Sequence, residues 1–135
     1  MKRRTLLVAA AIAVSGTGSD AHHAISSVYD NSRPVTIEGI VAHFQFVNPH
    51  PFLFIDVKDR TGEAQRWQLE MDNRGELASI GVTAGTFKPG DVVVVSGSLA
   101  RLSGQRLYLL RLDRRGDGFW YEQVGPSPRI RTPLG

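Results

Sequence analysis

The residues of this sequence whose type and spacing could support chemistry are its histidines. All four histidines, His22, His23, His43 and His50, fall between residues 22 and 50 of a 135-residue chain. Neutral imidazole is the commonest metal ligand in proteins and suits copper, zinc and nickel. His50 stands in the segment "NPHP", where a proline on each side limits the backbone freedom of the histidine. The pattern therefore favours a metal site built from the first third of the chain.

The amino terminus has the features of an export signal. Lys2, Arg3 and Arg4 precede the apolar run "TLLVAAAIAV", and small residues follow up to Ala21. This order is typical of a secretory signal peptide, and the apolar run is shorter than the roughly 20 residues that a membrane span needs. We expect residues 1–21 to be removed and the protein to be periplasmic or secreted.

Cleavage after Ala21 would make His22 the first residue of the mature chain. An N-terminal histidine offers two nitrogen donors, its amine and its ring, and one more imidazole would complete the nitrogen-rich tetragonal set that suits Cu(II). We therefore predict His22, His23 and His50 as metal ligands, with copper as the metal and zinc as the second choice. The competing interpretation is a solvated terminus and a purely structural "NPHP" turn.

Two other side chains could ligate a metal, but their settings favour packing. His43 lies inside a strand-like run, where we expect a half-buried histidine. Met71 follows an alternating strand and is expected in the hydrophobic core.

The motifs of the common enzyme classes are missing from the sequence. There is no cysteine, no Gly-x-Ser-x-Gly elbow, no His-Glu-x-x-His and no phosphate-binding loop. We therefore predict no catalytic residues and no enzyme, with copper-dependent oxidation as the one activity left open. Four acidic residues near the second and third strands are expected to form a solvated rim: Asp56, Asp59, Glu63 and Glu70.

The charge balance argues against a nucleic-acid partner. The chain has 16 Lys+Arg and 13 Asp+Glu, and the expected signal contains three of the former and one of the latter. The remaining chain is close to neutral, unlike a typical nucleic-acid-binding domain. It also contains no apolar run long enough to span a membrane. A metal-delivery protein or another envelope protein is the partner that we expect.

The sequence that follows the expected signal peptide predicts a mainly β domain over residues 22–124. Strand-like runs cover residues 33–50, 51–59, 64–71, 92–100 and 106–112, with a short edge strand at 119–124. Gly39 suggests a bulge or bend in the first run, and Asp72 or Asn73 could cap a short helix that Gly81 ends. This order favours a small OB-like five-stranded barrel with one short helix between strands 3 and 4, rather than a plain β-sandwich. Residues 125–135 are expected to be a Pro-rich extended tail.

Three segments carry a resemblance to a known family: "AHHAISSVYD", "PVTIEGIVAHFQFVNPHPFLFIDV" and "FKPGDVVVVSG". The sequence resembles a bacterial family of small exported proteins of unknown function. In that family a His-His pair lies beside the cleavage site and an Asn-Pro-His motif follows the first strand. The resemblance implies that His22, His23, Asn48, Pro49 and His50 occupy the shared motif positions. It implies no activity.

Two functions follow as hypotheses. The first is an exported metal-binding protein that holds or carries Cu(II). The alternative is a non-metal OB-type binding module that recognises a peptide, a glycan or a partner protein.

Overall fold

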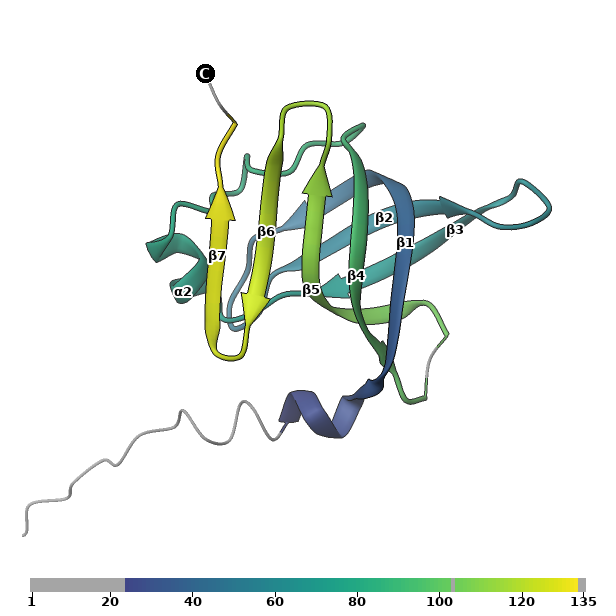
Figure 1. Ribbon diagram of the computed structural model, residues 1–135, viewed down its shortest axis with the longest axis horizontal. Coiled ribbons are helices and arrows are strands. Elements are labelled where there is room, and N and C mark those ends of the chain that lie inside the picture. The colour runs from purple at the N-terminus through teal and green to yellow at the C-terminus, as the bar shows by residue number, and fades with distance from the viewer. Residues whose placement is uncertain (1–23, 103, 134–135) are drawn as a thin grey trace, which may run out of the picture.

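The computed structural model describes residues 24–102 and 104–133, which form a mainly β protein (Figure 1). A short helix over residues 24–28 leads directly into the first strand. The elements that follow are β1 (Tyr29–Gln45), β2 (Phe52–Lys58), β3 (Ala64–Glu70), α2 (Arg74–Ser79), β4 (Val92–Ala100), β5 (Arg106–Arg114), β6 (Phe119–Val124) and β7 (Ser127–Arg131).

The seven strands form one sheet in the order β3-β2-β1-β4-β5-β6-β7. All neighbours in this order are antiparallel, and β3 also pairs in parallel with β5. This extra pairing joins β1, β2, β3, β5 and β4 into a closed ring, while β6 and β7 continue the sheet beyond β5 (Figure 1). The mainly β class is thus confirmed, but the sheet has two strands more than the five expected for the barrel.

Alternation of apolar and polar residues explains how the ring is filled. In β2, Leu53 and Ile55 are buried and their neighbours are more exposed, as expected for a strand with one face toward a core. Residues of α2 and of the loops join the buried apolar side chains of the strands in one cluster. The cluster comprises Val41, Leu53, Ile55, Leu69, Met71, Leu77, Val82, Phe87, Val93, Val95, Leu107, Leu109, Leu112, Phe119 and Tyr121.

Gly39 was expected to mark a bulge or a bend in the first strand, and no bulge lies at this residue. The register of β1 against β2 shifts between Val41 and His43, not at Gly39. A Cβ atom on Gly39 would lie 2.8 Å from the carbonyl oxygen of Asp56, so a side chain at this position would collide with β2. Glycine is therefore used here for close strand approach.

The helices are short. Asn73 caps α2, because its side-chain oxygen accepts hydrogen bonds from the backbone N–H groups of Gly75 and Glu76. Gly81 follows the helix with φ 103°, in agreement with its expected role at the end. No helix among the described residues is long and apolar enough to cross a membrane.

The segment expected as an edge strand and a tail completes the sheet. Residues 119–124 form β6, so the strand predicted from "FWYEQV" is confirmed, but it lies between β5 and β7 and not at the sheet edge. Part of the expected Pro-rich tail is extended as foreseen, but Ser127–Arg131 also pairs with β6 as strand β7. Ile130 of β7 lies against the core, so the packed part of the protein extends beyond residue 124.

Candidate metal site

The loop between β1 and β2 is held against the segment that links β3 to α2. The backbone N–H of Arg74 donates to the carbonyl of Pro49, and that of Met71 donates to the carbonyl of Pro51, both at 3.0 Å. The Asn48–Pro49 peptide bond is cis. These contacts fix both flanks of His50 to the same neighbouring segment, so its ring is presented from a well-anchored backbone.

The ring of His50 is largely buried and has a defined hydrogen bond. Its Nδ1 lies 2.9 Å from the carbonyl oxygen of Met71 and 3.4 Å from Oε1 of Glu70. A carbonyl oxygen can only accept, so Nδ1 donates the hydrogen and Nε2 of a neutral ring carries the lone pair. No hydrogen bond to Nε2 is found among residues 24–102 and 104–133. Within the described residues, Nε2 of His50 therefore has a lone pair without a hydrogen-bond partner, whereas Nδ1 is anchored.

Glu70 is held from its other side by Tyr29. The Tyr29 hydroxyl donates to Oε2 of Glu70, and the Tyr29 side chain is almost fully buried. Burial raises the pKa of Tyr29 well above its usual range, and the hydrogen bond to Glu70 acts in the same direction. Arg106 has the opposite influence on this pKa, and its Nε is buried without a hydrogen-bond partner among the described residues. The phenol thus stays protonated and serves as a donor to the carboxylate.

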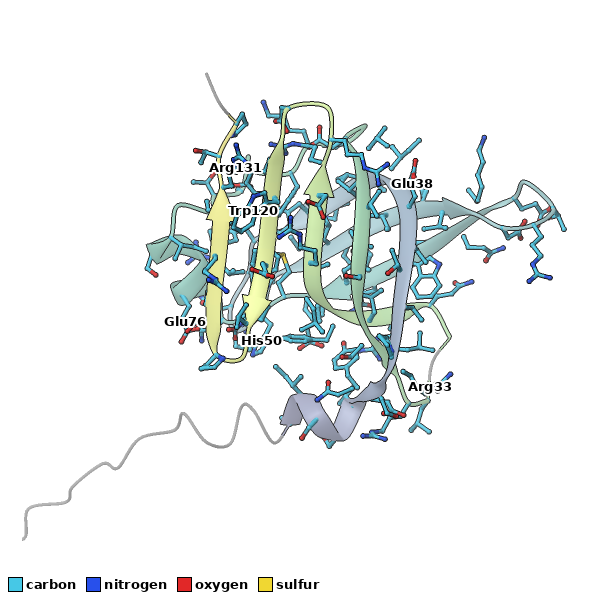
Figure 2. All side chains as sticks on the ribbon, viewed as in Figure 1. Arg33, Glu38, His50, Glu76, Trp120 and Arg131 are labelled. Atoms are coloured by element: carbon cyan, nitrogen blue, oxygen red, sulfur yellow. The ribbon has the colours of Figure 1, made fainter. Side chains whose placement is uncertain are left out.

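A small cavity of about 150 Å³ opens beside these groups. One wall comes from the helix over residues 24–28, and the other comes from the start of β1, the β1–β2 loop and the end of β3. Figure 2 shows His50 at the end of the sheet near which this helix lies. The volume is below the roughly 300–1,000 Å³ of most small-molecule sites, but it could hold an ion with water. The lining residues are Ala24, Ile25, Val28, Tyr29, His50 and Glu70.

The structure describes one of the three predicted metal ligands. His50 lies at the cavity, whereas His22 and His23 lie outside the described residues. No group of three or more His, Cys, Asp or Glu side chains able to hold a metal is found in the part of the chain that the structure describes. Within that part, His50 and Glu70 are the two potential ligands that line the cavity.

The side chains of the two secondary candidates, His43 and Met71, do not line this cavity. His43 is exposed rather than half-buried as expected, and its ring stacks on Phe54 with 6.0 Å between centroids. Its position on the open face of the β1–β2 ladder explains the difference. Met71 packs in the core as predicted and contributes its backbone oxygen, not its sulfur, to the surroundings of His50.

Sequence reasoning missed Tyr29 and Glu70. Glu70 was expected on a solvated rim, but its side chain is only 18% exposed and lies between Tyr29 and His50. The prediction failed because Glu70 occupies a polar position of an alternating strand, which normally faces water. Its partners come from distant parts of the chain, and no local pattern signals that contact.

A larger cavity of about 580 Å³ lies among the loops that follow α2 and β5 and the end of β7. Arg114 is its central charged group. Its guanidinium pairs with Asp91 and Asp117, donates to the carbonyl of Thr86 and stacks on the ring of Phe119. These contacts involve all three nitrogen atoms of the Arg114 guanidinium, so the cluster holds the neighbouring loops together.

Comparison with known proteins identifies a family. Residues 9–108 match a family described as a family of unknown function (DUF6152). No curated protein and no solved structure matches the chain significantly. The match covers most of the sequence, and the chain belongs to this family.

Proposed function

We propose that this member of the DUF6152 family is an exported protein of the periplasm or cell exterior that holds or carries Cu(II), with Zn(II) as the second choice. His22, His23 and His50 would be the ligands, and residues 1–21 would be a signal peptide. One observation carries the proposal: Ala24, which directly follows the His-His pair, lines the same cavity as His50.

Chain length supports this assignment. A residue spans at most about 3.6 Å of extended chain, so the two residues before Ala24 can cover roughly 7 Å. Ala24 already borders the small cavity in which His50 lies. This supports the proposal that His22 or His23 would supply nitrogen donors to the cavity in which His50 lies.

The donor chemistry also fits. Nδ1 of His50 is used by the Met71 carbonyl, which leaves Nε2 as the donor. Metal-binding histidines commonly hold their second ring N–H in this way. The α-amine of His22 would exist only after removal of the signal peptide. An α-amine has an ordinary pKa of about 8, so a metal could displace its proton near neutral pH. Copper would then receive three or four nitrogen donors.

We place the ligands on an OB-like barrel. The closed ring of β1, β2, β3, β5 and β4, with α2 between β3 and β4, supports this proposal, and β6 and β7 would be additions to the barrel. The His-His pair and the Asn-Pro-His motif would then lie at one end of the barrel.

The test is an electron paramagnetic resonance titration with Cu(II). The sample is protein exported and processed by cells, with its mass confirming a start at His22. We expect one tetragonal, nitrogen-rich signal that saturates at one copper per chain.

Three variants make the test specific. His50→Ala and a single methionine placed before His22 should each weaken binding at least tenfold, because one removes a ring donor and the other moves the amine. His43→Ala is the matched control and should bind copper like the parent protein. Only weak, heterogeneous signals from the parent protein, or equal affinity in all variants, would refute the proposal.

A second candidate function is a non-metal binding module for a peptide, a glycan or a partner protein. The cavity of about 580 Å³ favours it, because this volume is within the range of small-molecule and side-chain sites. Capture of a defined partner that is unaffected by His50→Ala and by chelators would support this function over metal binding.

A further inference from the structure

We infer that Glu70 and Tyr29 are positioning residues of His50: together with the Met71 carbonyl they keep its Nδ1 protonated and leave Nε2 as the metal-binding nitrogen, and they favour a doubly charged ion over a singly charged one. The part that concerns the ion rests on the proposed function. The part that concerns the ring stands on the contacts of the described residues alone.

The first step is the orientation of the imidazole. Two oxygen atoms face Nδ1 of His50, the Met71 carbonyl at 2.9 Å and Oε1 of Glu70 at 3.4 Å. Both are acceptors when Glu70 is ionised, and neither could donate to an unprotonated Nδ1. The neutral ring is therefore held as the Nδ1–H tautomer.

The second step is the immobilisation of the carboxylate. The buried hydroxyl of Tyr29 donates to Oε2 of Glu70, so the two carboxylate oxygens have different tasks. Oε2 accepts the hydrogen bond from Tyr29, and Oε1 faces Nδ1 of His50. Without the hydroxyl, the carboxylate could rotate away from the ring.

The third step concerns charge. A metal on Nε2 withdraws electrons from the ring and makes its Nδ1–H a stronger donor, and a nearby carboxylate compensates this effect. The gain is larger for a doubly charged ion, because charge interactions scale with the charge. Cu(I) prefers soft sulfur ligands, but the Met71 side chain is fully buried in the core. The arrangement therefore selects Cu(II) over Cu(I).

The tautomer is tested on metal-free protein. Nitrogen-15 NMR of the His50 ring distinguishes a protonated Nδ1 from a protonated Nε2. We expect the Nδ1–H form in the parent protein and a detectable Nε2–H population in Glu70→Gln, whose amide can donate to Nδ1. A parent protein with Nε2–H as its main form would overturn the inference whatever its copper chemistry.

The charge effect is tested by competition titrations with Cu(II) and Cu(I) chelators. We expect Glu70→Gln to weaken Cu(II) binding about 10- to 100-fold and to change Cu(I) binding much less. A loss of this size is usual when a group that contacts a metal-binding histidine, but not the metal, is removed. Tyr29→Phe, which removes one oxygen atom, should act in the same direction, and Glu63→Gln in the exposed β2–β3 turn is the matched control. Equal losses for both ions would overturn the selectivity. A parent protein with the Nδ1–H form and no copper affinity would refute the proposed function while the tautomer assignment stands.

Discussion

Replacing Gly97 by alanine is a stringent test of the close approach of β4 and β5. Gly97 lies in β4 at a register shift and pairs with Leu109 of β5. A Cβ atom at Gly97 would lie 2.0 Å from the backbone oxygen of Tyr108 and 2.8 Å from a methyl carbon of Leu107. The methyl of Leu107 could move, but the backbone oxygen could move only if β5 shifted.

The cost follows from this contact. Adding a methyl group to a packed interior destabilises proteins by about 1–3 kcal/mol when neighbours can adjust. Because the obstructing atom belongs to the main chain of a paired strand, we expect Gly97→Ala to lose about 3 kcal/mol or more. In a domain of this size that corresponds to a fall in Tm of roughly 10 °C or more.

The assay is urea unfolding followed by far-ultraviolet circular dichroism. Gly116→Ala is the control, because a Cβ there meets no atom within 4 Å and the residue has no positive φ. It should stay within about 0.5 kcal/mol of the parent protein. If Gly97→Ala were as stable as Gly116→Ala, the close approach of β4 and β5 described above would be wrong.

Three further perturbations have defined outcomes. The pKa values of all three tyrosines are raised, chiefly by burial, so stability should be complete below about pH 10 and fall as the pH rises further. Tyrosinate absorbance should then appear together with unfolding, and earlier ionisation of a folded tyrosine would contradict this. The Arg114 guanidinium lowers the pKa of Asp117, so that carboxylate stabilises the fold above about pH 4 and loses its effect as the pH falls through the lowered pKa. Melting curves from pH 6 to pH 2.5 should therefore show less acid sensitivity in Asp117→Asn than in the parent protein. Asn73→Ala removes the cap of α2 and should cost about 1 kcal/mol in urea unfolding, whereas Asn73→Asp should restore most of it.

Local patterns predicted most of the secondary structure. The alternation of Trp67 and Leu69 with polar residues marks β3, and both side chains pack inward from it. The helix after β3 was recognisable because Asn73 and Gly81 bracket a short segment without strand character. Such signals lie within a few residues of each other, so they can be read without knowledge of the fold.

Long-range features could not be predicted in the same way. The segment "SPRIR" contains proline and alternating arginines, which suggests a tail, yet Ile130 gains a place against the core and the chain pairs with β6. Of the residues that line the small cavity, the sequence singled out His50 through its two flanking prolines. The Tyr29–Glu70 hydrogen bond joins residues 41 positions apart and arises only when the folded sheet brings the start of β1 to the end of β3.

The pairing of β1 with β4 also bears on when the chain can fold during synthesis. Tyr29 pairs with Ala100 and Ile40 with Val92, so one edge of β1 has no partner until β4 has been made. The parallel contact of β3 with β5 comes later still. Folds dominated by such distant pairings form slowly, in about milliseconds to seconds, because the intervening chain must be ordered first. A nascent chain that has reached α2 has only the β1–β2–β3 meander, and its core closes after β5 has emerged. The topology therefore suits a polypeptide that is completed as a whole before it folds.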